Sequence, residues 1–139
     1  MIENYKNTVE KALKDYFLEY SKNSSYSSLI WESMSYTTLL GGKRLRAIMC
    51  FEVGRIFKVK IEDLIPCACA LEVMHAYSLI HDDLPCMDND DLRRQKPTNH
   101  KVFGEAIALL AGDALIPFGA QLIIEKTPEK ISKTTILDI

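Results

Sequence analysis

The amino-acid sequence predicts an all-α protein built as one globular domain. Apolar residues recur at helical spacing along most of the chain, helix-forming residues dominate, and neither Asn-Gly nor Asp-Gly occurs as a hairpin signal. The 139 residues are 47% hydrophobic, which suits a single core of moderate size. The formal net charge of −2 provides no overall field that would attract nucleic acid or an anionic membrane, so function is expected in local clusters.

The first three helices are expected before residue 58. The first is amphipathic, and its buried stripe consists of Val9, Leu13, Phe17 and Tyr20. The serine-rich run 21–28 is the expected loop after it. A second helix over 29–40 should end at Gly41 and Gly42, because glycine adopts the positive φ of a helix C-terminus without strain. A third helix is expected over about 43–57.

Two longer helices and a polar loop follow. Pro66 suits a helix start, and the apolar pattern then continues to Pro85, whose ring disfavours helix at the residue before it. The segment Asp88–Asn99 is expected to be a loop. The last helix should run from about Gly104 to Glu125, with a kink at Pro117.

The chain start and the cysteines indicate a cytoplasmic protein. The start has no apolar core of a secretory signal, and no segment offers about 20 uninterrupted apolar residues for a membrane span. The cysteines, which form no CxxC pair of a structural zinc site, are Cys50, Cys67, Cys69 and Cys86. They are expected to be buried or partly buried free thiols, with Cys67 and Cys69 on different faces of one helix.

The run "HDDLPCMDNDDLRR", residues 81–94, places five aspartates at the expected C-terminal end of a helix. That end carries partial negative charge, so the aspartates require a cation nearby. Mg²⁺ suits them, because it takes carboxylate oxygens and shares them with substrate phosphates. An EF-hand does not fit, since Leu92 and Arg93 would occupy a ligand position and the required glycine position. The alternative is a solvated acidic loop.

Two basic clusters are candidate phosphate sites. Arg93 and Arg94 follow the aspartates directly, and arginine suits bidentate phosphate recognition, although simple pairing with the carboxylates is the alternative. The run "GGKRLR", residues 41–46, places Lys43 and Arg46 one turn apart at an expected helix N-terminus. Backbone N–H groups and the helix dipole favour an anion there.

A histidine shares the helix stripe that leads to the aspartates. Counted at about 100° per residue, His75 and Ser78 fall within roughly 60° of Asp82. His75 is therefore either part of the same cleft or an ordinary core histidine. Together, one carboxylate cluster and two basic clusters on apolar helices indicate two phosphorylated substrates, at least one of them bound as a magnesium complex.

The segment "HAYSLIHDDLPCMDNDDLRRQKPTNHKVFGEAIALLAGDAL" resembles the first aspartate-rich region of trans-isoprenyl diphosphate synthases, the polyprenyl synthetase family. "GGKRLR" resembles the diphosphate-binding motif upstream of it. The resemblance implies an isoprenoid-synthase-type helical bundle. It also implies a prenyltransferase that uses Mg²⁺, or alternatively Mn²⁺, to condense isopentenyl diphosphate with dimethylallyl or geranyl diphosphate, giving farnesyl diphosphate.

The resemblance also implies residue roles. The metal ligands would be Asp82 and Asp88, with Asp83 in or next to their shell. Arg93 would hold the allylic diphosphate and complete the catalytic set. The residues implied to hold isopentenyl diphosphate are Lys43, Arg46, His75 and Arg94. Product length would depend on Tyr77, five residues before the motif, and on its neighbour Ser78.

The resemblance covers about Met34 to Leu115, whereas family chains continue into a second aspartate-rich motif. Residues 1–139 are therefore expected to be the N-terminal part of a synthase domain, homodimeric as the family is. An apolar face left uncovered would favour self-association. The alternatives are an inactive half-domain that binds Mg²⁺ and diphosphate, and a partner subunit of a complete synthase. Gln95 stands where the family usually has glycine.

Overall fold

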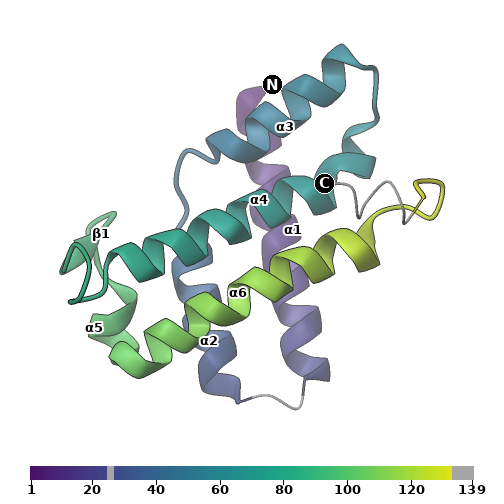
Figure 1. Cartoon of the computed structure of the whole chain (residues 1–139). Helices are drawn as coiled ribbons and strands as arrows, with labels where there is room; N and C mark the ends of the chain where they lie inside the picture. Colours follow the sequence, from purple (N-terminus) through teal and green to yellow (C-terminus); the bar gives the residue numbers. More distant parts are fainter. Residues whose placement is uncertain (25–26, 133–139) are drawn as a thin grey trace.

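Two long helices, α4 (Ile61–Asp82) and α6 (Glu105–Lys126), lie side by side at the centre of the molecule (Figure 1). The computed structural model describes residues 1–24 and 27–132. The other elements there are α1 (Ile2–Asn23), α2 (Ser28–Thr38), α3 (Leu45–Ile56), β1 (Leu92–Arg93), β2 (Lys96–Pro97) and α5 (Asn99–Phe103). The predicted all-α class is confirmed.

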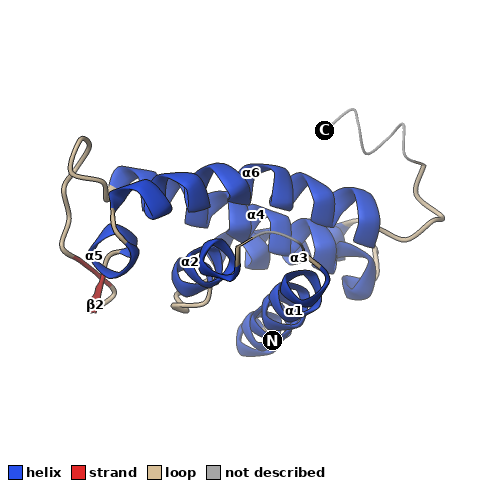
Figure 2. Cartoon of the chain, turned by 90° about the horizontal axis from the view of Figure 1, so that it is seen from below, coloured by secondary structure: helices blue, strands red, loops and turns tan. Residues whose placement is uncertain are grey.

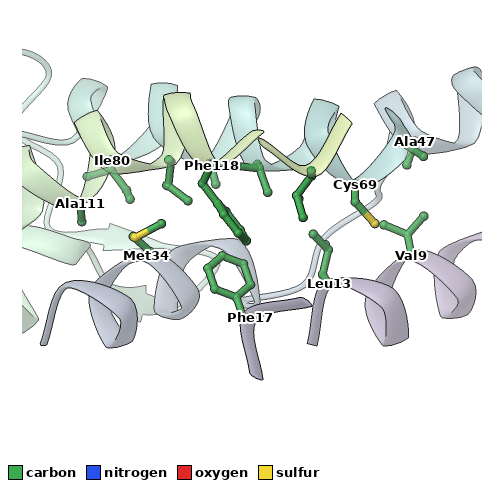
Figure 3. Close-up of a cluster of buried hydrophobic side chains, with 14 of the residues drawn as sticks. Val9, Leu13, Phe17, Met34, Ala47, Cys69, Ile80, Ala111 and Phe118 are labelled. Carbon is green, nitrogen blue, oxygen red and sulfur yellow. The ribbon is translucent and has the colours of Figure 1, made fainter. Parts of the chain in front are cut away.

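The core lies between the central pair and the N-terminal helices. Figure 2 shows α1, α2 and α3 on one side of α4 and α6. From α1, the side chains of Val9, Leu13 and Phe17 point into this layer, as the predicted amphipathic stripe requires (Figure 3). The ring of Phe17 lies 5.1 Å from that of Phe118 on α6, and Trp31 of α2 packs edge-on against both. Aromatic packing thus joins α1, α2 and α6.

The predicted start of the fourth helix was wrong. α4 begins at Ile61, and Pro66 lies buried in its second turn. Two acidic residues, Glu62 and Asp63, occupy the first turn, where the helix dipole favours negative charge. The last helix was predicted well, and α6 continues through Pro117 as one helix.

The segment Asp88–Asn99, predicted as a loop, contains a short β-hairpin, and the helix α5 begins at its last residue. Leu92 pairs with Pro97, and Arg93 pairs with Lys96, so two residues form the turn. These are Arg94 and Gln95, with φ values of 52° and 63°. Two-residue hairpin turns with positive φ normally use Asn-Gly or Asp-Gly. The hairpin was missed because this turn carries neither signal.

Replacing Gln95 with glycine should stabilise the protein. A side chain in the left-handed region costs about 1 kcal/mol, and glycine removes that cost at φ 63°. Urea unfolding of Gln95→Gly should therefore show a free energy of unfolding about 0.5–1 kcal/mol higher. The control is Lys96→Gly, in the adjacent strand, which should lower stability because glycine weakens a strand. Equal losses in both variants would contradict the assigned turn.

Apolar side chains remain exposed on the outer surfaces of α3 and α6. The largest on α3 are Leu45, Met49, Val53 and Ile56, and on α6 they are Leu109, Leu110, Ile116 and Ile124. The expected uncovered apolar face is present, while self-association through it stays a prediction. By length and composition α4 and α6 also qualify as membrane spans, a property that core helices of globular proteins share.

The cysteines of the described residues are free thiols. Cys69 is buried and Cys67 half-buried, so the two occupy different faces of α4 as predicted. Cys50 on α3 is also half-buried. The prediction was wrong for Cys86, which is exposed because it lies in the turn that follows α4.

Candidate functional site

The chain turns back just after α4 and brings the backbones of two aspartates together. The helix ends at Asp82, and the backbone N–H of Asp88 donates to the Asp82 carbonyl at 2.8 Å. The intervening turn is closed by the N–H of Asn89, which donates to the Leu84 carbonyl at 3.1 Å. Asn89 has a φ of 54°, which asparagine tolerates better than most residues. The Asp88 side chain is exposed and Asp82 is half-buried.

Asp83 points in a different direction from its neighbour. Its side chain is almost fully buried, and its two oxygens accept hydrogen bonds from Nε and Nη2 of Arg93 at 2.8 and 2.6 Å. This bidentate contact raises the pKa of Arg93, with smaller contributions from the nearby charges of Asp90 and Asp82. This ion pair, in which Asp83 is buried and Arg93 half-buried, fixes the hairpin against the end of α4.

The three predicted metal ligands therefore do not form one cluster. Asp83 pairs with Arg93, and within residues 1–24 and 27–132 the structure has no group of three or more acidic, histidine or cysteine side chains arranged for a metal. Asp82 and Asp88 remain, with their backbones joined by a hydrogen bond at the end of α4. Sequence reasoning placed Asp83 in or next to the metal shell, and in the structure its carboxylate pairs with Arg93.

Arg94 joins the hairpin to the glycine-rich run before α3. Its guanidinium lies directly against Gly42, where a Cβ atom would be 2.6 Å from Cζ of Arg94. Gly42 also has a φ of 127°, so both the space and the backbone conformation require glycine. Partial burial lowers the pKa of Arg94, and the charge of Arg44 lowers it further. Two basic clusters that are 50 residues apart in sequence thus meet in space.

His75 lies within this basic cluster. Burial lowers its pKa, and the positive charges of Arg46, Arg94 and Arg93 lower it further, against the opposing charge of Glu72. The imidazole is therefore neutral at neutral pH and can donate one hydrogen bond. The structure brings together three predicted residues from α3, α4 and the hairpin. Lys43, the fourth, is exposed in the loop before α3.

The N-terminus of α3 was predicted to offer free N–H groups to an anion, and this was wrong in part. The carboxylate of Glu72 reaches it from α4, and its Oε1 accepts the Ala47 N–H at 3.2 Å. Arg44 precedes the helix with a φ of 51°, and its guanidinium contacts Glu72 at 3.3 Å, Glu10 at 2.7 Å and the Thr38 carbonyl at 2.8 Å. An internal carboxylate thus occupies part of the expected anion site.

Sequence reasoning missed Arg44 and Glu72 as a structural unit. The available signal was the position of Glu72, the only acidic residue between Asp63 and Asp82 in a largely apolar helix. A single carboxylate in such a helix is either paired or functional, because burying an unpaired charge is costly. Here it is paired, and it ties α1, α3 and α4 together through Arg44.

The predicted product-length residues lie on α4 one to two turns before Asp82. Tyr77 is half-buried, and its ring packs edge-on against His81 with the centroids 5.7 Å apart. The Ser78 hydroxyl donates to the His75 carbonyl at 2.9 Å and so stays within its own helix. Nε2 of His81 lies 3.1 Å from the Leu109 carbonyl, which anchors this end of α4 to α6.

The arrangement of helices is that of isoprenoid synthases. A geranyltransferase from Legionella pneumophila superposes with a TM-score of 0.91 at 36% identity, over 98% of this chain and 46% of that one. A geranyltranstransferase from Thermotoga maritima gives a TM-score of 0.80 at 38% identity, over 92% and 46%. The chain belongs to the polyprenyl synthetase family, whose model matches residues 27–138.

Relatives with different products match this chain. A farnesyl diphosphate synthase of Geobacillus stearothermophilus is 45% identical over 130 residues, 94% of this chain and 44% of that protein. A chloroplastic geranylgeranyl pyrophosphate synthase of Catharanthus roseus is 51% identical over 121 residues, 87% of this chain and 32% of that protein. The chain therefore spans less than half the length of these relatives.

Proposed function

We propose that the chain contributes to a prenyltransferase that condenses isopentenyl diphosphate with an allylic diphosphate to give farnesyl diphosphate. The observation that carries the proposal is the basic cluster of Arg46, His75 and Arg94, in which His75 lies about two turns before Asp82 on α4. Such a cluster suits one diphosphate, and two carboxylates suit a second diphosphate bound as a metal complex. Family membership and relatives named as farnesyl diphosphate synthases agree with it.

Asp82 and Asp88 are the residues proposed to hold Mg²⁺, or Mn²⁺ in its place. Their chemistry fits, because Mg²⁺ is commonly held by one or two carboxylates together with substrate phosphates. When bound, the metal would supply positive charge that favours departure of the allylic diphosphate. Asp83 is proposed to act next to this pair, where it holds the Arg93 guanidinium in a fixed direction.

The basic residues have separate proposed roles. Arg93, oriented by Asp83, would hold the allylic diphosphate, and catalysis here is positioning plus electrostatic stabilisation of a leaving group. The set proposed to hold isopentenyl diphosphate is Lys43, Arg46, His75 and Arg94. A neutral His75 would donate a hydrogen bond to one of its phosphate oxygens.

Tyr77 and Ser78 are proposed to limit product length. Tyr77 lies about 7–8 Å along the helix from Asp82, at 1.5 Å rise per residue. Its half-buried ring, held edge-on against His81, would form the floor of the prenyl cavity and favour farnesyl over geranylgeranyl diphosphate. We also propose that the protein is cytoplasmic and forms a homodimer. Mass spectrometry of the diphosphate made from isopentenyl and geranyl diphosphate tests the proposed product length.

Asparagine at Asp82 or Asp88 should weaken metal-dependent diphosphate binding strongly. The probe is inorganic diphosphate titrated into the chain by calorimetry, with Mg²⁺ and then with EDTA. We expect Mg²⁺ to strengthen binding to the parent, and Asp82→Asn or Asp88→Asn to weaken it by at least about tenfold, because each removes a proposed ligand. The matched control is Asp91→Asn in the same loop, whose carboxylate pairs with Lys101 at 2.8 Å.

The control should keep its affinity within about twofold, since exposed pairs contribute little. Equal losses in all three variants would show that only the net charge of the loop matters. Binding that is identical in Mg²⁺ and in EDTA would contradict the metal site directly.

A further inference from the structure

Two cysteines lie opposite each other between α3 and α4, away from the proposed diphosphate site. The two helices run antiparallel, and two contacts define which residues face each other. At one end the Ala47 N–H reaches Glu72, and at the other Gly54 packs on Leu64, where a Cβ on the glycine would lie 2.0 Å from Leu64 Cδ1. Cys50 of α3 and Cys67 of α4 lie between these two contacts and therefore face each other.

The absence of a side chain at Gly54 lets the helices approach closely, one turn from Cys50. The Cys50 and Cys67 thiols lie close enough to interact, and hydrogen bonding between them is the main influence on both of their pKa values. This bond lowers the pKa of Cys67 to about 7, against the effect of burial, and it helps to raise the pKa of Cys50. The lowered pKa favours the thiolate of Cys67, and the thiolate is the reactive form of cysteine.

Small oxidants can reach this pair. Both cysteines are half-buried, and Cys50 lines an open apolar groove of about 510 Å³ together with Met49, Val53 and Leu71. Cys69 differs, because it is buried on the core side of α4 and burial raises its pKa to about 12.

We propose that Cys50 and Cys67 are an oxidation site at which a peroxide forms a disulfide linking α3 to α4. The Cys67 thiolate attacks one peroxide oxygen, giving a sulfenic acid and hydroxide. The Cys50 sulfur then attacks the sulfenic sulfur, forming the S–S bond, and the leaving hydroxide takes the Cys50 proton to give water. Two sulfurs together lose two electrons, which the peroxide gains, and a dithiol reductant reverses the reaction.

The disulfide would fix the relative position of two helices that carry charged residues. Arg46 lies one turn before Cys50 on α3, and His75 lies about two turns after Cys67 on α4. Oxidation would therefore hold Arg46 and His75 at a fixed distance from each other. The site itself is independent of the proposed function, because it requires only the α3–α4 contact.

The test uses the full chain with Cys86→Ser, which removes the exposed thiol and leaves three cysteines. After treatment with hydrogen peroxide, the intact mass should fall by two hydrogen atoms and one free thiol should remain. Trypsin should release residues 47–55 joined to residues 61–93. The midpoint of thermal unfolding should rise by about 10 °C, because a loop of this length is closed, and dithiothreitol should reverse every change.

Three further variants, each made in the Cys86→Ser background, show which cysteines form the disulfide. Cys50→Ser and Cys67→Ser should both lose the mass change and the thermal shift, whereas Cys69→Ser should keep them. Circular dichroism of the reduced proteins identifies variants that fold. In the folded parent, Cys67 oxidised to a sulfinic acid beside a free Cys50 would overturn the proposal, and so would a cross-link to Cys69.

Discussion

Glu72→Ala should lower the free energy of unfolding by about 3 kcal/mol, the cost expected when one partner of a buried ion pair is removed. Arg44 would lose its contact with Glu72 while its side chain remained 3% exposed, and the Ala47 N–H would lose its acceptor. Since domains of this size are stable by about 5–15 kcal/mol, the loss is a large share of the total. Urea unfolding followed by circular dichroism measures it.

Two variants separate the charge from the hydrogen bonds. Glu72→Gln keeps an oxygen that can accept from the Ala47 N–H, so it should cost about 1–2 kcal/mol, less than the alanine variant. Glu52→Ala removes a carboxylate that is 34% exposed and pairs with the exposed Arg55 on the same helix, and it should cost less than about 0.5 kcal/mol. If Glu72→Ala behaved like Glu52→Ala, the buried network would not stabilise the contact between α3 and α4.

Two signals predicted parts of the fold from the sequence: the helical spacing of apolar residues and the position of glycines. The stripe of Val9, Leu13 and Phe17 located α1 and its buried face because helical spacing reports directly on burial. Gly41 and Gly42 marked the break after α2, and both have positive φ in the structure. These signals are local, so the sequence alone is enough to interpret them.

The unpredicted parts depend on contacts between distant residues. The hairpin turn at Arg94 has no local signature, and its conformation is supported by the packing of that guanidinium on Gly42. In the same way, Asp83 and Asp82 are adjacent in sequence, yet only one of them faces Arg93. The resemblance predicted the site residues, but it did not show which carboxylate would pair with Arg93.

Arg93→Met should also destabilise the protein by about 3 kcal/mol, because it leaves the Asp83 carboxylate, 2% exposed, without its bidentate partner. Measured by urea unfolding without metal or diphosphate, this loss is independent of any proposed substrate contact. The matched control is Arg55→Met. Arg55 makes a similar two-donor contact with Glu52, but its side chain is 59% exposed, so the expected change is within about 0.5 kcal/mol.

A double variant shows whether the cost comes from the unpaired charge. Asp83→Asn combined with Arg93→Met removes both charges, so it should be more stable than Arg93→Met alone by about 1–2 kcal/mol. A double variant that is the sum of the two single losses would mean that the residues act independently. Asp83 would then not be the group that orients Arg93, and the geometry proposed for holding the allylic diphosphate would lose its support.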